Sequence, residues 1–267
     1  MPLKIATWNI NSVRLRIGLV TRFLETWQPD ILCLQETKCP QGQFPSAALK
    51  DIGYPYLAER GQSGYHGVAI VARIPFEAHT HRLFCGKDDC RHISATFAGA
   101  HPLTIHNLYV PAGGDEPDPA INEKFAHKLK FLDELESWFA DGAVPGGRNG
   151  VVVGDLNVAP LENDVWSHRQ LLKVVSHTPV ETEGLNRVQR AGKWVDVMRK
   201  HVPDDQKLYT WWSYRARDWD IADRGRRLDH IWATTDIAPR FAKIETPREV
   251  RGWPQPSDHI PVIATLE

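Results

Sequence analysis

Polar residues follow short apolar runs at six places along this sequence. Asp155 and Asn157, for example, come directly after the run Val151–Gly154. The residues found at the six places are Asn9, Asn11, Glu36, Tyr109, Asp155, Asn157, Asp229, Asp258 and His259. Functional side chains concentrate on loops that a rigid scaffold holds in place. We therefore predict that these strand ends meet at one rim of the folded molecule.

The chemistry of this set indicates a divalent metal ion and a phosphate. Carboxylate and amide oxygens are hard ligands, which suit Mg²⁺ or Mn²⁺ better than Zn²⁺, a metal that favours Cys and His. Carboxylates gathered without a cation repel one another, and the repulsion raises their pKa values. A divalent ion relieves that repulsion, and a phosphate completes its ligand shell. No Ser, Cys or Lys in these motifs stands beside an evident base, so a covalent nucleophile is not indicated.

Many short apolar runs supply the strands that must position these residues. The expected strands are Leu3–Trp8, Ile31–Gln35, Gly67–Ala72, Ile93–Phe97, Leu103–Tyr109, Val151–Gly154, Leu208–Trp212, Leu228–Ala233 and Ile260–Leu266. Several are apolar on both faces, which is typical of strands that are covered on both sides. So many strands with few helices between them favour an α/β fold with two sheets packed face to face and helices outside. No break in composition divides the chain, so residues 1–267 are expected to form one domain.

Three segments predict helices. Val13–Trp27 has apolar residues at helical spacing, and Pro29 follows its end. Asp118 and Pro119 suit the first turn of a second helix that would extend to Gly142. Its apolar stripe would comprise Ile121, Phe125, Leu129, Leu132, Leu135 and Phe139. The third expected helix is Glu181–Arg190.

Charge and composition limit the class of protein. The 267 residues include 32 basic and 33 acidic side chains, a formal net charge of −1. This balance excludes a polybasic, histone-like binder, but it permits an acidic metal site beside a local basic rim. No apolar run approaches the roughly 18 residues that a membrane span needs. The apparent lack of a signal peptide and the four cysteines, expected as reduced thiols, favour a soluble cytoplasmic protein.

Seven segments together resemble one family. They are Thr7–Asn11, Leu34–Lys38, Asn107–Pro111, Gly154–Asn157, Thr210–Arg215, Arg227–His230 and Ser257–Pro261. Each segment alone is a weak signal, but all seven follow the family's order over essentially the whole chain. By this pattern the sequence resembles the exonuclease III type of abasic-site endonucleases, within the endonuclease/exonuclease/phosphatase superfamily.

The resemblance implies a four-layer α/β sandwich and Mg²⁺-dependent hydrolysis of DNA phosphodiesters, with Mn²⁺ as a substitute cofactor. Activities in this family include incision 5′ to abasic sites, 3′→5′ exonuclease action and removal of blocked 3′ ends. The expected partner is double-stranded DNA with abasic sites or 3′ ends, and the expected state is a monomer that binds no membrane. The sequence leaves the balance between incision and exonuclease action open.

The resemblance also implies roles for individual residues. The metal-binding set would be Asn9, Glu36, Asp155, Asn157, Asp258 and His259, with Glu36 as the main ligand. Asp155 would orient or deprotonate the attacking water, and Asn157 would hold the phosphate and help to fix Asp155. His259, oriented by Asp229, would bind a phosphate oxygen. Tyr109 would lie close to the scissile phosphate, either as a hydrogen-bond donor or as a phenolate.

The expected DNA contacts lie at the same rim and in the Arg-rich segment that follows Trp212. They are Asn11, Trp211, Trp212, Arg215 and Arg217. At least one of the two tryptophans is expected to pack in the core, and the other would stack against an extrahelical sugar or base. Arg beside Trp suits phosphate contact with stacking. The alternative is a solvated loop, because nearby aspartates offset part of the charge.

Two other functions compete with the nuclease hypothesis. The same scaffold could hydrolyse an inositol phosphate or a phospholipid, although no amphipathic membrane-binding helix is evident in the sequence. The chain could also be a DNA-binding or interaction protein that has lost catalysis. The intact set of carboxylates, amides and His259 disfavours this second alternative.

Overall fold

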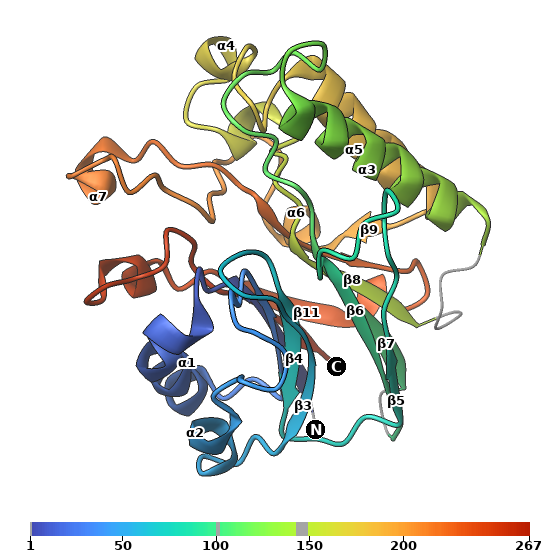
Figure 1. Ribbon diagram of the computed structural model, residues 1–267, viewed down its shortest axis with the longest axis vertical. Helices are drawn as coiled ribbons and strands as arrows, with labels where there is room; N and C mark the ends of the chain where they lie inside the picture. The colour runs from blue at the N-terminus through green and yellow to red at the C-terminus, as the bar shows by residue number, and fades with distance from the viewer. Residues whose placement is uncertain (1, 100–101, 143–148) are drawn as a thin grey trace.

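Two six-stranded sheets pack face to face, with helices on both outer sides (Figure 1). The computed structural model describes residues 2–99, 102–142 and 149–267. The predicted α/β sandwich of two sheets is therefore confirmed. No helix within these three ranges is both long and apolar enough to cross a membrane.

The first sheet joins the two ends of the chain. Its order is β11-β12-β1-β2-β4-β3. These strands are β11 (Phe241–Glu245), β12 (Val262–Leu266), β1 (Leu3–Asn9), β2 (Ile31–Gln35), β4 (Val68–Ala72) and β3 (Tyr56–Arg60). β1 runs parallel to β2 and antiparallel to β12. The carboxyl ends of β1 and β2 and the amino end of β12 consequently lie at one edge of the sheet.

The second sheet has the order β5-β6-β7-β8-β10-β9. These strands are β5 (Ala78–Thr80), β6 (His92–Phe97), β7 (Leu103–Tyr109), β8 (Gly150–Asp155), β10 (Asp229–Ala233) and β9 (Val195–Asp196). β10 is antiparallel to β8, and Asp229 lies directly opposite Asp155. Gly154 is required just before Asp155, because its φ is 134° and a Cβ there would lie 2.0 Å from the carbonyl oxygen of Leu108.

Helices α1 (Val13–Trp27) and α2 (Ser46–Lys50) cover the first sheet, and α3 (Glu123–Ala140) and α5 (Pro179–Ala191) cover the second. Shorter elements lie in the connections. They are η1 (Glu162–Asp164), α4 (His168–Leu171), α6 (Val197–His201), α7 (Trp219–Ala222), η2 (Ala238–Arg240) and η3 (Arg248–Gly252). Apolar side chains fill the space between the two sheets, including Ile5, Ile70, Ile105, Val153 and Val262. This rigid core holds the strand ends that carry the polar residues.

Several predicted elements need correction. The second helix begins at Glu123 and not at Asp118, because Asn122 caps it by accepting from the N–H groups of Lys124 and Phe125. Ile121 therefore lies outside the helix and is 74% exposed. The segment Leu208–Trp212 is not a strand, since only Trp211 forms isolated bridges, to Arg226 and His259.

The sequence analysis missed four strands, and all four lie at sheet edges. They are β3, β5, β9 and β11. Edge strands pair on one side only and are often short or polar, so they lack the apolar run that identifies a central strand. Four short helices, α2, α4, α6 and α7, were missed for a similar reason, since each has only four or five residues.

Candidate active site

The predicted rim exists, because strand direction brings the polar strand ends to one edge of the sandwich. Asn9 ends β1, Tyr109 ends β7 and Asp155 ends β8, and Asp229 begins the antiparallel strand β10. The residues brought together are Asn9, Glu36, Tyr109, Asp155, Asn157, Asp229, Asp258 and His259. They come from both sheets, and this explains their wide separation in the sequence.

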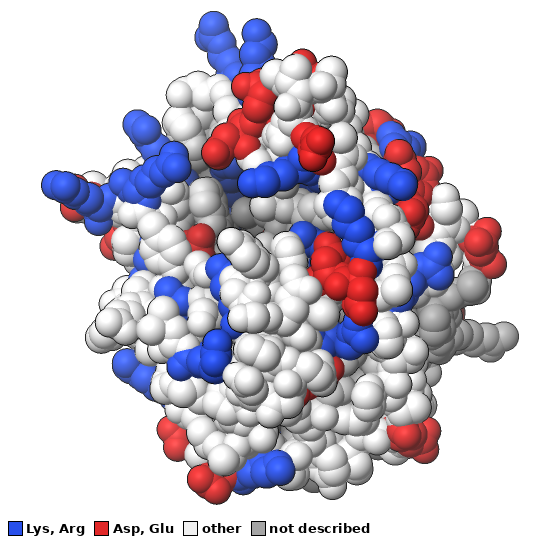
Figure 2. Space-filling model, viewed as in Figure 1, with Lys and Arg blue, Asp and Glu red and all other residues white. Residues whose placement is uncertain are grey.

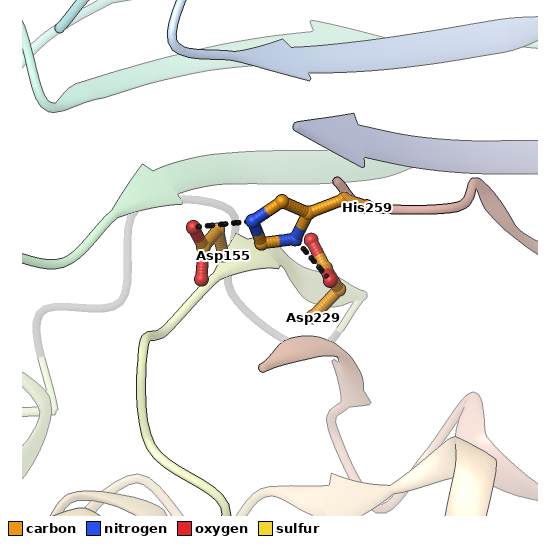
Figure 3. Close-up of side chains that lie close together, drawn as sticks. All are labelled: Asp155, Asp229 and His259. Carbon is orange, nitrogen blue, oxygen red and sulfur yellow. Dashed lines mark hydrogen bonds and ion pairs between the residues drawn. The ribbon is translucent and has the colours of Figure 1, made fainter. Parts of the chain in front are cut away.

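His259 lies between two carboxylates (Figure 3). Its Nδ1 is 2.8 Å from Oδ2 of Asp229, and its Nε2 is 3.7 Å from Oδ2 of Asp155. Burial opposes the charged ring, but the two carboxylates, Asp229 above all, outweigh it and raise the pKa of His259 to about 10. The ring is therefore an imidazolium at neutral pH. The contact with Asp229 holds the ring so that Nε2 faces Asp155.

Asp155 is a buried carboxylate with a fixed orientation. Asn9 Nδ2 donates to its Oδ2 over 2.8 Å and Asn157 Nδ2 over 3.1 Å, while the Asn157 backbone N–H donates to Oδ1 over 3.0 Å. Burial raises the pKa of Asp155 to about 7, the charge on Asp229 adds to that rise, and His259 opposes it. A carboxylate with a pKa near neutrality is suited to accept a proton.

Glu36 stands beside Asp155 in a constrained turn. Its φ of 48° places a non-glycine residue in the left-handed region, and Asn157 has a φ of 54°. Such positions are strained and cluster at functional sites. Burial raises the pKa of Glu36, but the positive charge of Lys38, whose Nζ lies 2.9 Å from Oε2, and the hydrogen bond from Asn9 lower it by more. Glu36 is thus an ionised carboxylate at neutral pH.

Asn9 links the two carboxylates through its amide NH₂ group. Its Nδ2 donates to Glu36 over 2.9 Å and to Asp155 over 2.8 Å. Its amide oxygen accepts from the backbone N–H of Asn11 over 3.1 Å. The sequence analysis expected that oxygen to be a metal ligand. In the structure this oxygen accepts one hydrogen bond, from Asn11, and the NH₂ group holds the two carboxylates in place. Metal binding by Asn9 stays a prediction.

Tyr109 is a neutral phenol in this environment. Burial raises the pKa of Tyr109 well above its usual value, and the charges of Glu36 and Asp155 raise it further. The guanidinium of Arg91 lies 5.0 Å above its ring and only partly offsets these effects. This environment favours the hydrogen-bond donor over the phenolate, the two roles that the sequence left open.

The site carries more negative than positive charge. Its four carboxylates are Glu36, Asp155, Asp229 and Asp258. Among the described residues only Lys38 and His259 form ion pairs with this group. Oδ1 of Asp229 is buried and has no hydrogen-bond partner in the described parts of the chain. Ligand atoms of Asp155, Asp229 and His259 lie within 4.8 Å of one another. This oxygen-rich, anionic group fits a hard divalent cation.

The expected DNA-contact residues separate into two environments. Trp211 lines a cavity at the site, and its Nε1 donates to Oδ2 of Asp258 over 2.9 Å. Asn11 donates to Oδ1 of the same carboxylate over 3.2 Å. Trp212 is only 2% exposed and packs with Tyr209 away from this cavity. The expectation that one tryptophan belongs to the core thus describes Trp212.

The Arg-rich segment contributes to the site unevenly. Arg215 lines the cavity, whereas Arg217 is exposed outside its lining. Figure 2 shows Lys and Arg side chains gathered on the side of the molecule where α4 and α7 lie. A basic rim therefore adjoins the acidic site, although the net charge of the chain is close to zero.

The sequence analysis missed a buried ion pair beneath the site. Lys128 on α3 pairs with Glu181 on α5, and both side chains are fully buried. Lys128 Nζ also donates to the carbonyl oxygens of Asn157, over 2.8 Å, and Ala112, over 3.2 Å. It therefore supports the loop that carries Asn157. A lysine at a core position of an amphipathic helix was the signal that would have identified it.

Comparisons with known proteins agree with this geometry. Residues 6–259 match the model of the Endonuclease/Exonuclease/phosphatase family. Exodeoxyribonuclease III of Haemophilus influenzae is 28% identical over 274 residues, which cover 99% of this chain and 100% of that protein. The structure is similar to that of an AP endonuclease from Archaeoglobus fulgidus, with a TM-score of 0.90, 33% identity and 99% of each chain covered. A 3′ phosphatase from Neisseria, solved with a product DNA hairpin, has a TM-score of 0.89, 29% identity and the same coverage.

Proposed function

The chain belongs to the endonuclease/exonuclease/phosphatase family and is a DNA repair nuclease, and from this premise we propose how its site works. We propose that it uses Mg²⁺, with Mn²⁺ as a substitute, to hydrolyse DNA phosphodiesters 5′ to abasic sites and at 3′ ends. The observation that carries the proposal is the pairing of a buried carboxylate, Asp155, with a cationic donor, His259, at 3.7 Å. That pairing supplies a base and a phosphate ligand side by side.

The excess carboxylates provide the cation site. Glu36 would be the main ligand, with Asp258 and the oxygens of Asp155 and Asn157 beside it, and Asn9 would orient Glu36. A divalent ion held there supplies positive charge against the oxygens of the phosphate. Lys38 and Asn11 support this site, since Lys38 Nζ contacts Oδ1 of Asn11 at 2.6 Å.

Asp155 would remove the proton from the attacking water. Asn9 and Asn157 hold its carboxylate in one orientation, so little reorganisation is needed during attack. A positioned base contributes roughly 10²–10⁴ in rate. Tyr109 and His259 would donate hydrogen bonds to the non-bridging oxygens, where negative charge grows as the pentavalent phosphate forms. Asp229 keeps His259 charged throughout.

The DNA would approach over the basic rim. Trp211 lies at the cavity wall and offers an aromatic face, while Arg215 and Arg217 offer charge to phosphates. Asn11 would contact DNA only through the exposed side of the loop that also supports Asp258. Trp212, which is packed in the core, would act by holding this segment in place.

The decisive experiment uses a labelled duplex with one abasic-site analogue, incubated with Mg²⁺ or with EDTA. The proposal expects incision 5′ to the analogue with Mg²⁺, no incision with EDTA, and recovery when Mg²⁺ or Mn²⁺ is added back. Binding without incision would instead support a protein that has lost catalysis. Phosphate release only from inositol phosphates or phospholipids would support the other enzymatic alternative. Asp155→Asn serves as the matched control, because it keeps the shape of the site and removes the base.

We propose three further features of the protein. The free cysteines suit a reducing cytoplasm. The interleaved strands, with β1 paired to β12, support one domain over residues 1–267. We also propose that the enzyme acts as a monomer on double-stranded DNA, which light scattering with and without a duplex would test.

A further inference from the structure

We propose that Arg226 is a specificity-determining residue that recognises a second anionic group, attached to the scissile phosphate on its departing side. The proposal rests on the proposed function, because it takes the acidic end of the cavity as the place of the scissile phosphate. The cavity has a volume of about 730 Å³ and extends from Asp155 and His259 to Trp166, Trp211 and Arg226. This size is in the range of pockets that hold a nucleotide-sized ligand.

Arg226 is fixed in the wall of this cavity. Its Nη1 donates to the carbonyl oxygen of Val175 over 2.9 Å and to Oγ of Ser176 over 2.8 Å. Its guanidinium carbon lies 5.1 Å from the ring centre of Trp211. The guanidinium is thus held in place before any ligand binds, so that binding of an anion would cost little conformational entropy of the Arg226 side chain.

Arg226 lacks an ion-pair partner among the described residues. Both of its side-chain hydrogen bonds come from Nη1 and go to neutral acceptors, and it forms no ion pair within the described residues. Its Nε is buried and has no acceptor there. The next residue, Arg227, pairs with both Asp164 and Asp196. The charge of Glu181 acts on Arg226, but Glu181 forms its ion pair with Lys128. A largely buried cation without an ion pair of its own is unfavourable, and a ligand anion would supply that partner.

Two other arginines at this end of the cavity are also without an ion pair in the described parts of the chain. Arg224 lies 4.8 Å above the ring of Trp166, Arg215 also lines the cavity, and neither forms an ion pair with a described residue. Of the four carboxylates that line the cavity, Glu36, Asp155 and Asp258 belong to the active site, and Asp115 is the fourth. The cavity therefore has an acidic end for a cation and the scissile phosphate, and around its three arginines it has more positive than negative charge, which suits a second anionic group.

The bond that breaks during hydrolysis determines which part of the substrate lies at the basic end of the cavity. Water oxygen adds to phosphorus and gives a proton to Asp155, the bond from phosphorus to O3′ breaks, and O3′ takes up a proton from solvent, so that the DNA keeps a 3′-hydroxyl. The phosphate leaves with whatever was attached beyond it, so that attached group occupies the cavity. An abasic sugar is neutral, whereas a glycolate ester carries a carboxylate. Charge-assisted hydrogen bonds are stronger than neutral ones, so Arg226 would favour the charged group.

The required anion has two possible sources. One is a carboxylate on a small 3′ blocking group. The other is the next phosphate of a continuous strand, beyond an abasic sugar. In both cases the negative charge is joined to the scissile phosphate by only a few atoms. Substrates that differ only in this charge distinguish the two sources.

The test compares two pairs of duplexes. The first pair ends in 3′-phosphoglycolate or in a 3′-phospho-2-hydroxyethyl ester, in which a neutral hydroxyl replaces the carboxylate. The second pair carries an internal abasic analogue followed by a normal phosphate or by an uncharged methylphosphonate. The ratio of kcat/KM within each pair is measured for the wild type, Arg226→Met, Arg226→Lys and the control Arg217→Met. Arg217 is a suitable control because it lies outside the cavity lining in the same segment.

The wild type should favour the charged member of at least one pair by about 10-fold or more. Arg226→Met should bring that ratio close to one, Arg226→Lys should keep part of it, and Arg217→Met should lower both members equally. The pair that shows the preference identifies the source of the anion. A wild-type ratio near one in both pairs, or a ratio that survives in Arg226→Met, would overturn the proposal. If Arg226→Met does not fold, the ratios of the wild type and of Arg226→Lys still test the proposal, because the ratio should be lower in Arg226→Lys than in the wild type. Failure to cleave any of the four duplexes with Mg²⁺ would instead contradict the proposed function.

Discussion

Two groups of buried charges lie side by side in this protein, and they differ in how completely they are paired. In the first group, Asp164 and Asp196 accept from Arg199 and Arg227, so two carboxylates meet two guanidinium groups. The second group is the active site, where four carboxylates have only Lys38 and His259 as cations among the described residues. Only one residue separates Arg227 of the first group from Asp229 of the second.

The difference separates structural from functional charge. A fully paired group holds loops together and needs nothing from outside. It holds η1 against β9 and the segment before β10, through Asp164, Asp196 and Arg227. An incompletely paired group can bind a ligand of opposite charge. The direction of the pKa shift differs between the two groups, since the pKa of Asp155 is raised and that of Asp164 is lowered. Breaking the paired group should therefore cost stability, whereas breaking the active site should cost activity.

The largest expected effect is on catalysis. Asp155→Asn should lower kcat by at least about 10², because a positioned base contributes that much or more. Burial and neighbouring charge disfavour the ionised Asp155, so the neutral amide should leave the unfolding temperature unchanged or higher. Single-turnover incision, DNA binding and thermal unfolding measure the three quantities. A variant with near wild-type turnover would remove Asp155 from the mechanism.

The next effect is on stability and concerns the paired group. Arg227→Met should lower the free energy of unfolding by about 3 kcal/mol, since it leaves the buried Asp164 with Arg199 alone and takes from Asp196 its ion-pair partner. Urea unfolding measures the loss. Adding Asp164→Asn to Arg227→Met should recover part of it, and a double variant no more stable than Arg227→Met would contradict the pairing argument.

A smaller effect should appear on acidification. His230 accepts from Arg227 at Nδ1 and donates to the carbonyl oxygen of Val158 from Nε2, so the ring is neutral. Burial lowers the pKa of His230 to about 4, and Arg227 adds to this. The unfolded chain therefore binds a proton below about pH 6.5 that the folded state excludes until about pH 4. Stability should fall by up to about 3 kcal/mol as the pH falls through that window.

Urea unfolding between pH 4 and pH 7 tests this expectation. His230→Gln has no titrating ring and should show a weaker dependence on pH than the wild type. Equal slopes for the two proteins would mean that other groups, and not His230, govern acid sensitivity.

The smallest expected effect concerns the basic rim. Replacing Arg215 and Arg217 with Ala should reduce the slope of log Kobs against log salt by about 1–2, because each phosphate contact contributes about 0.9. Neither arginine forms an ion pair with a described residue, so stability should not change. An unchanged salt slope would place this segment outside the DNA interface.

The sequence predicted the central parts of the molecule better than its margins. Helix α1 and strands β2 and β7 have the predicted bounds, because buried elements carry a clear apolar pattern. The motifs also identified Glu36, Asp155 and His259 as members of one site. The sequence did not identify the edge strands, which lack that pattern.

Within the site, the unpredicted features depend on three-dimensional contacts. The amide of Asn9 turns its NH₂ group toward the carboxylates because two acceptors face it. Trp212 packs in the core with Tyr209, and Asp223 accepts from its indole N–H at 3.0 Å. That Arg226 forms no ion pair with a described residue is visible only in the folded structure. No spacing of residues along the chain encodes these contacts.

The pairing of β1 with β12 makes the active site depend on the first sheet remaining closed. His259 is located just before β12, so it reaches Asp155 only while β12 is docked beside β1. Loss of this strand pairing would therefore take the imidazolium out of the site, while Asp155 and Asp229 would stay joined within the second sheet.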